Sequence, residues 1–331
     1  MVGFLTPREI PWDWSTVADY LERVEKNGPV LNVGTLLAHG AVRTTAMGMT
    51  RRPPTEEDYR TMEYLIAQSL DEGSFGISFG LIYPPGQYST TDELKYLCKI
   101  AKTHGRYAAF HQRGGGSQTL VDSVNELIEI GLATGIPVHH SHEVAHGRGD
   151  WSAIDATIEL KEKAVKRGVD ITQDVIPYVS VCTTMLAIYP PWTLADGVSG
   201  LLEHLNNPST RRKIKDDIES LTPQWPPWQE EGWPVNIVQD FGWENIFIAY
   251  VSGKNKKYEM KNISQIGHEI GRDPFDAISD IVVEEEGTVT QLIFGINGDR
   301  TTDEPLKKLL RLPTRALVTD AWDIGEGRPH P

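Results

Sequence analysis

The stretch RYAAFHQRGGGSQTLVDSVNELIEIGLATGIPVHHSH, residues 106–142, contains two short apolar runs separated by a longer amphipathic segment. The runs 106–111 and 136–142 have the length and residue types of buried strands, and each ends in a histidine. Residues 117–135 carry apolar residues at three- and four-residue steps, which predicts a helix with one packed face. A helix between two strands predicts parallel pairing, because a parallel neighbour requires a crossover connection.

The same alternation continues on both sides of this unit. Helical patterns occupy 55–73 and 151–168, and further strand-like runs lie at 30–38, 73–81, 169–178, 244–251, 288–295 and 316–320. This rhythm is compatible with an eight-stranded (β/α) barrel and with an open doubly wound sheet. The barrel is favoured because barrel enzymes place their chemistry at the carboxyl ends of several strands. Polar residues at such ends are His111, His142, Asp174, Tyr178 and Asp320.

The segment 185–243 departs from this rhythm. It is rich in proline and carries Trp192, Trp225, Trp228, Trp233 and Trp243. One interpretation is a lid or pocket wall whose aromatic side chains contact an apolar substrate group. The other is an insertion that packs its tryptophans for its own stability. We therefore expect one domain over 1–331, with 185–243 as an insertion before the last strand.

Composition limits the classes of partner and the compartment. The 331-residue chain has a formal net charge of −14 at pH 7, which argues against nucleic acid and anionic membranes as partners. Cys98 and Cys182 are the two cysteines; they cannot form a disulfide scaffold and they fit a reducing cytosol. The first residues lack the pattern of a signal peptide, and no apolar run is long enough to span a bilayer. We expect a soluble, cytoplasmic protein.

The stretch PVHHSHEVAHG, residues 137–147, holds four of the ten histidines. On a strand successive side chains point to opposite faces, so His140 and His142 should share one face and His139 the other. His142, at the strand end, is then the best-placed metal ligand, and His140 is second. Adjacent strands lie about 5 Å apart, so the imidazoles of His111 and His142 can meet one ion at about 2 Å each. The alternative is that these histidines are hydrogen-bonded structural residues.

Several motifs resemble those of the N-acyl-D-amino-acid deacylases, or D-aminoacylases, of the amidohydrolase superfamily. The most specific is GLIYPPGQYSTTDEL (80–94), which a strand-end histidine follows. The others, in the family's order, are IPWDW (10–14), LNVGTLLAHGAVR (31–43), AAFHQR (108–113), GIPVHHSH (135–142), DVIPYVSVCTTMLAIYPPW (174–192) and LVTDAWDIGEGRPHP (317–331). The resemblance implies a TIM-like metal-dependent hydrolase barrel that carries zinc and removes the acyl group from N-acyl-D-amino acids.

The resemblance also implies roles for individual residues. His111 and His142 become zinc ligands, and Asp320, in a VTD sequence, becomes the general acid/base. This agrees with elementary chemistry, because a catalytic zinc takes neutral imidazoles and lowers the pKa of its water to about 7, and a neighbouring carboxylate can move the proton. His39, Arg113 and Tyr178 are candidates for substrate binding. For His39 the alternative is to brace the loop after a strand, and for Arg113 to be a surface arginine.

The matched motifs correspond to barrel strands three to eight. The family's HxH motif and ligand cysteine, which come from strands one and two, have no match, and neither Cys98 nor Cys182 takes the place of that cysteine. The sequence His140-Ser141-His142 has the form of HxH, but its surroundings match the sixth-strand histidine instead. We therefore expect an incomplete barrel, part of a longer polypeptide or split enzyme, with zinc weakly bound or absent in this chain.

Three departures from the family pattern bear on the substrate. They are Gln112, Val144 and Ile176, at positions where many family members have methionine, lysine and tyrosine. They leave open how a substrate carboxylate is held. Two alternatives to linear-amide hydrolysis therefore remain: a hydantoinase-like enzyme that acts on cyclic amides, and a non-catalytic barrel fragment that requires a partner segment.

Overall fold

A computed structural model describes residues 12–229 and 232–321 of the chain. Six strands form one sheet in the order β1-β2-β3-β4-β5-β9, and each neighbouring pair is parallel. The strands are β1 (Leu37–Ala38), β2 (Gly76–Gly80), β3 (Tyr107–His111), β4 (Val138–Ser141), β5 (Ile171–Val175) and β9 (Arg315–Leu317). This confirms the predicted parallel α/β architecture, and in the described part of the chain β1 and β9 are the two unjoined ends of the sheet.

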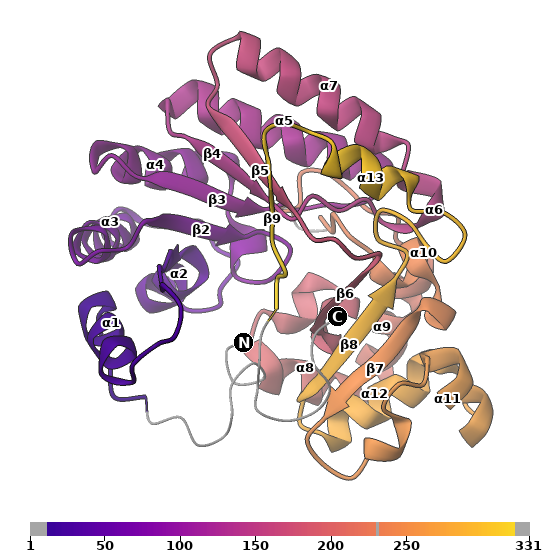
Figure 1. The fold of residues 1–331 in the computed structure, drawn as a ribbon. Helices are drawn as coiled ribbons and strands as arrows, with labels where there is room; N and C mark the ends of the chain where they lie inside the picture. The colour runs from indigo at the N-terminus through magenta and orange to yellow at the C-terminus, as the bar shows by residue number, and fades with distance from the viewer. Residues whose placement is uncertain (1–11, 230–231, 322–331) are drawn as a thin grey trace.

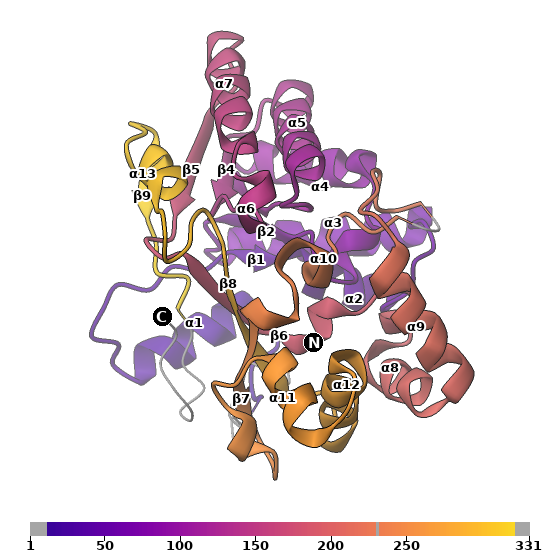
Figure 2. The ribbon, with the colours of Figure 1, turned by 90° about the vertical axis from the view of Figure 1, so that its right-hand side faces the viewer.

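Helices cover one face of this sheet, as Figures 1 and 2 show. The covering helices are α3 (Glu56–Asp71), α4 (Thr91–Thr103), α5 (Ser117–Thr134) and α7 (Ala153–Lys166). The shorter elements nearby are α1 (Val17–Lys26), α2 (His39–Met47), the 3-10 turn Gly86–Tyr88, α6 (Gly147–Asp150) and α13 (Glu304–Leu310). Alternate strand residues such as Phe79, Phe110 and Val138 pack against these helices in one large apolar core. The other face of each strand is therefore left for polar side chains.

A second body lies between β5 and β9 in the sequence. Its three-stranded sheet has the order β6-β8-β7 and is antiparallel throughout. The strands are β6 (Ser180–Thr184), β7 (Ile246–Val251) and β8 (Val289–Phe294). The helices are α8 (Gly197–Asn206), α9 (Pro208–Ser220), α10 (Ile237–Phe241), α11 (Ile263–Ile270) and α12 (Pro274–Glu284). Short 3-10 turns lie at Met185–Ile188, Pro191–Leu194, Trp243–Asn245 and Lys256–Tyr258. It has its own apolar core and lies beside the parallel sheet in Figure 1.

This second sheet corrects the expected strand pairing. The runs 244–251 and 288–295 do form strands, but they pair in an antiparallel sheet with β6 instead of joining the parallel one. The run 169–178 also divides, because β5 ends at Val175 and β6 begins at Ser180. An apolar run predicts a strand but does not determine which strand pairs with it. The domain division, with an insertion at 185–243, stays a prediction; β6 precedes that segment, and β7 and β8 follow it.

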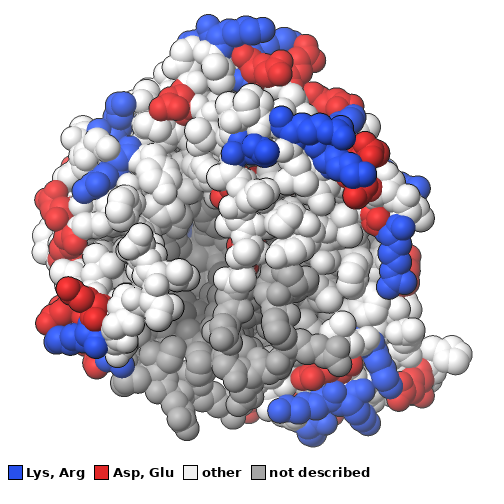
Figure 3. All heavy atoms as spheres, viewed as in Figure 1, with Lys and Arg blue, Asp and Glu red and all other residues white. Residues whose placement is uncertain are grey.

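The surface in Figure 3 shows described basic and acidic side chains next to one another around the rim of this face, with uncharged side chains between them. No helix among the described residues combines the length and apolar character needed to cross a membrane.

Helix α3 begins with a reciprocal cap that we expect to be important for stability. The Thr55 side chain accepts a hydrogen bond from the Asp58 amide at 3.2 Å, and the Asp58 carboxylate accepts one from the Thr55 amide at 2.6 Å. Thr55→Ala should lower the free energy of unfolding by about 0.5–2 kcal/mol, because an amide at the helix start loses its partner. Urea unfolding followed by circular dichroism measures this loss.

Thr45→Ala is the matched control, because Thr45 is exposed in α2 and its hydroxyl donates only to the carbonyl of Ala41. We expect that control to change the unfolding free energy by less than about 0.5 kcal/mol. Equal effects of the two substitutions would show that the cap does not stabilise the fold.

Candidate active site

Two histidines meet at the carboxyl end of the parallel sheet. His111 is the last residue of β3, and His142 directly follows β4. The Nδ1 atom of His111 lies 3.1 Å from the Nε2 atom of His142, and the ring centroids are 4.5 Å apart in an edge-to-face arrangement. The structure therefore brings together the two residues that the sequence proposed as metal ligands.

His142 reaches this position because the backbone leaves the strand conformation there. In the register His111 lies beside Ser141, and His140 lies beside Phe110 on the face that packs against the helices. His142 has a φ of 34°, so the alternation of side chains that holds along an extended strand is broken after Ser141. The expectation that His140 and His142 share a face is wrong for this reason.

His140 has a structural role on the helix side of the sheet. Its ring is fully buried, with Nε2 2.8 Å from the Gln112 side-chain oxygen and Nδ1 3.4 Å from the Lys161 amine. Burial, together with the nearby Lys161 charge, lowers the pKa of His140 far below its ordinary value. His140 is thus a neutral, hydrogen-bonded core residue, and its expected place as second-best ligand is wrong because it lies on the far side of the sheet from His111.

Asp174 on β5 holds the backbone turn at His142. Its carboxylate accepts a hydrogen bond from the His142 amide through one oxygen and lies 2.8 Å from the Nε2 atom of His139 through the other. Burial by itself would raise the pKa of Asp174, but these two hydrogen bonds outweigh burial and lower the pKa. The sequence placed Asp174 at a strand end but gave no indication that it would hold the neighbouring strand's histidine.

Asn297, which follows β8, holds the same loop from the second body. Its side-chain oxygen accepts from the Ala145 amide at 2.7 Å, and its side-chain nitrogen donates to the Glu143 carbonyl at 2.7 Å. Asn297 is fully buried. Sequence analysis missed it because a single asparagine, distant in the sequence from the histidines, has no local pattern.

The histidine pair fits two positions of a zinc site. Burial, followed by the neighbouring His142, lowers the pKa of His111 well below its ordinary value, so the ring is neutral, as a metal ligand must be. Nitrogens bound at about 2.0–2.1 Å to a tetrahedral zinc are roughly 3.3 Å apart, close to the observed 3.1 Å. Within the described residues, no group of three or more His, Cys, Asp or Glu side chains is arranged to hold a metal ion.

Asp320, the predicted acid/base, follows β9 with a φ of 52° and is exposed. No hydrogen bond or ion pair joins it to either histidine in the described part of the chain. Tyr83 lies near His111, and the Asp320 charge acts on its hydroxyl. Its ring centroid is 5.7 Å from that of His111, and its hydroxyl is hydrogen-bonded to Thr183. Burial raises the pKa of Tyr83 to about 12. The hydrogen bond with Thr183 opposes this rise, and the Asp320 charge increases it.

The three residues predicted to contact substrate occupy different environments. Arg113 is not a surface arginine: it is fully buried and donates to the Glu126 carboxylate at 2.7 Å. His39 is fully buried at the start of α2, with Nε2 3.4 Å from the Glu93 carboxylate. Tyr178 is half-buried against the core of the second body. Substrate contact by these three stays a prediction.

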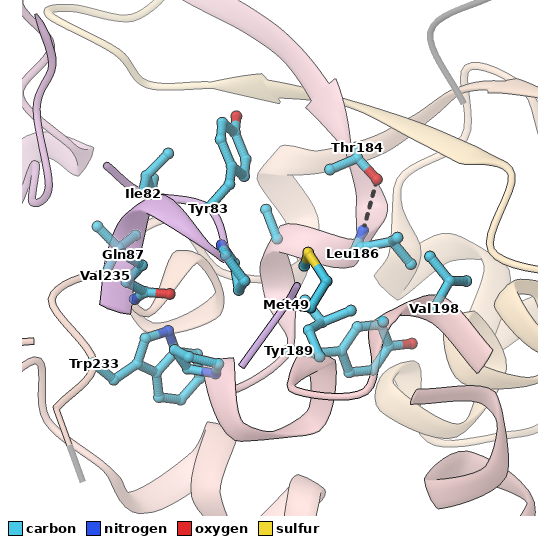
Figure 4. A pocket seen from close by; sticks show the side chains of 15 residues that line it. Met49, Ile82, Tyr83, Gln87, Thr184, Leu186, Tyr189, Val198, Trp233 and Val235 are labelled. Atoms are coloured by element: carbon cyan, nitrogen blue, oxygen red, sulfur yellow. Dashed lines mark hydrogen bonds between the residues drawn. The ribbon is translucent and has the colours of Figure 1, made fainter. Parts of the chain in front are cut away.

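An apolar cavity of about 80 Å³ has Tyr83 in its wall, and the Tyr83 ring centroid in turn lies 5.7 Å from that of His111. The view in Figure 4 shows side chains from the loop after β2 and from the second body around one space. Trp233 and Val235 come from the tryptophan-rich segment, which the sequence offered as a pocket wall. Met49 also lines the cavity, and nothing in its sequence context indicated this.

A parallel sheet covered by helices, with polar side chains at its carboxyl edge, is the arrangement in which (β/α)-barrel enzymes place their active sites. No protein-family model matches the chain. This chain is 30% identical to D-aminoacylase of Alcaligenes xylosoxydans xylosoxydans over 168 aligned residues. The aligned residues make up 51% of this chain and 34% of that protein. It is also 30% identical over 173 residues to the same organism's N-acyl-D-glutamate deacylase, covering 52% and 35%.

Solved structures give the same result for the fold. An N-acyl-D-glutamate deacylase from Bordetella bronchiseptica, complexed with zinc and a phosphonate inhibitor, superposes with a TM-score of 0.72 at 20% identity, over 97% of this chain and 54% of that one. A D-aminoacylase superposes with a TM-score of 0.68 at 21% identity, over 96% and 53%. The resemblance to N-acyl-D-amino-acid deacylases is thus confirmed, and the chain spans about a third of the curated relatives' length and half of these solved chains.

Arg113 should contribute strongly to stability. Besides Glu126, its guanidinium donates to the carbonyls of Gln87 at 3.2 Å and Ser89 at 2.8 Å. Arg113→Met should lower the free energy of unfolding by about 3–5 kcal/mol, because it leaves a buried carboxylate without its cation. Urea unfolding measures the change.

The matched control is Arg60→Met, which removes a surface pair with Glu56 at 3.8 Å and should change stability by less than about 1 kcal/mol. Losses of the same size in both variants would contradict the structural role assigned to Arg113.

Cys182 should be unreactive in the folded chain. It is free and half-buried on β6. Burial raises the pKa of its thiol to about 12; the hydrogen bond with Thr290 opposes this rise, and the Asp320 charge increases it. At pH 8 the side chain is then almost entirely the thiol, whereas the thiolate is the reactive form. A Cys98→Ser variant should react with a thiol reagent far more slowly when folded than when unfolded in urea. Equal rates in the two states would refute the assignment.

Proposed function

We propose that this chain carries part of the active site of a zinc-dependent hydrolase that removes the acyl group from an N-acyl-D-amino acid. The observation that carries the proposal is the contact of His111 with His142 at the carboxyl edge of a parallel sheet whose fold is that of the D-aminoacylases. Sequence similarity to D-aminoacylase and to N-acyl-D-glutamate deacylase supports the substrate class.

His111 and His142 would hold the zinc ion, since their ring nitrogens face one another at a suitable spacing. A catalytic zinc usually has three protein ligands, so the proposal requires at least one ligand besides this pair. Zinc supplies Lewis-acid activation of the amide and of the attacking water. The hydrogen bond from the His142 amide to Asp174 keeps one of the two ligands in position.

Asp320 would move the proton in this reaction. Its exposed carboxylate can accept a proton from the attacking water and deliver it to the leaving nitrogen, and such transfer contributes about 10²–10⁴-fold to the rate. Tyr83 lies against His111 and its charge environment includes Asp320. This common neighbour supports a single site for the three groups.

Substitutions should separate metal binding from proton transfer. His111→Ala and His142→Ala should each lower the bound zinc and abolish hydrolysis of N-acetyl-D-amino acids, because a ligand is lost. Asp320→Asn should retain the zinc bound by the unaltered chain but lower kcat by about 10²–10⁴-fold. Zinc content after dialysis and amine release give the two measurements.

His104→Ala is the matched histidine control, because its ring pairs with Asp71 away from the pair, and it should change neither quantity. Hydrolysis retained by His142→Ala would rule out its role as a ligand. An unaltered chain without zinc or turnover would favour the non-catalytic alternative.

A further inference from the structure

The apolar cavity that Tyr83 shares with the surroundings of His111 is built by segments from both bodies of the molecule. Ile82, Tyr83 and Gln87 come from the loop after β2, and Met49 follows α2; the second body supplies Thr184, Leu186, Ala187, Tyr189, Pro191, Leu194, Gly197, Val198, Trp233 and Val235. Figure 4 shows Met49, Leu186 and Tyr189 close to one another at one side of this space, with Trp233 and Val235 at another.

Among the described residues, those that line the cavity include no charged side chain. Two of its polar groups are already hydrogen-bonded: the Tyr83 hydroxyl to Thr183, and the Tyr189 hydroxyl to Ser279 at 3.2 Å. Arg51, which is close in sequence to Met49, has its guanidinium over the Tyr88 ring and donates to the Gln229 carbonyl. A carboxylate placed in the cavity would therefore lose its hydration without gaining a cation, which is strongly unfavourable.

The size of the cavity limits its occupant further. Its volume of about 80 Å³ is roughly half of the ~150 Å³ that accommodates benzene in a protein interior. A short branched aliphatic group fits this volume better than an aromatic ring. Burying such a group is favourable by about 0.8 kcal/mol for each CH₂ removed from water.

We propose that this cavity binds an aliphatic group of about four carbons in the substrate and excludes acidic groups. The proposal rests on the function proposed above and narrows it, because Tyr83 lies both in the cavity wall and against His111. The relatives include enzymes named for N-acyl-D-glutamate and N-acyl-D-aspartate. By its cavity chemistry this chain acts instead on a neutral aliphatic substrate.

The aliphatic group has two possible sources, the amino-acid side chain and the acyl group, and two substrate pairs distinguish them. N-acetyl-D-leucine against N-acetyl-D-glutamate tests the side chain, and N-(3-methylbutanoyl)-D-alanine against N-succinyl-D-alanine tests the acyl group. In one pair the aliphatic member should have a kcat/KM higher by about 10–200-fold, the range that pocket contacts give. Equal values in both pairs, or a preference for the acidic members, would overturn the proposal.

Two variants test the cavity itself. Met49→Lys places a cation in the wall and should lower the preference for the aliphatic substrate at least about tenfold. Ala187→Leu fills the space and should lower kcat/KM for the aliphatic substrate but not for the acidic one. Met47→Lys is the matched control, because Met47 is half-buried at the end of α2 but does not line the cavity. It should retain the preference. If Met49→Lys and Ala187→Leu both retain it, the cavity does not bind the substrate.

A binding measurement separates this proposal from the proposed function. The neutral amide 3-methylbutanamide, titrated into the unaltered chain and followed by NMR, requires no turnover. Saturable binding that Met49→Lys removes and Met47→Lys retains supports the cavity even if hydrolysis is absent. Hydrolysis without any such binding, and with unchanged preferences in the variants, refutes the cavity and leaves the proposed function standing.

Discussion

The hydrogen bond from the His142 amide to the Asp174 carboxylate is the contact on which the candidate site depends. It fixes a backbone with positive φ directly after β4, and that conformation directs the imidazole of His142 toward His111. In an extended backbone the side chain would point to the helix side, as that of His140 does. The geometry of the histidine pair is thus produced by one turn after β4, between two neighbouring parallel strands.

The turn is held by both bodies of the molecule. On the helix side, Glu143 forms a buried ion pair with Lys161 of α7, and Lys161 also lies 2.6 Å from the side-chain oxygen of Gln173. From the second body, Asn297 hydrogen-bonds both sides of the loop after His142. The second body therefore holds the loop after His142 and also supplies most of the residues that line the cavity.

The histidine pair and the adjoining cavity divide the proposed chemistry between them. In the proposed function His111 and His142 are the metal ligands that set the reaction class, and the uncharged walls around Met49 and Trp233 select the substrate. In the described part of the chain no charged side chain lines the cavity, and Val144 is likewise apolar where many family members have lysine. Under that proposal, substrate selectivity arises from desolvation of the substrate group and not from an ion pair.

Local patterns in the chain predicted most of the parallel strands, the covering helices and the two histidines at neighbouring strand ends, because strand and helix periods are local properties of the sequence. It could not determine that His140 faces away from His142, that 246–251 and 289–294 form a separate antiparallel sheet, or that Arg113 is buried against Glu126. Those outcomes depend on backbone turns and on contacts between residues distant in the sequence. They become visible only in the folded molecule, because hydrogen bonds such as those of Asp174 and Asn297 join residues that are far apart in the sequence.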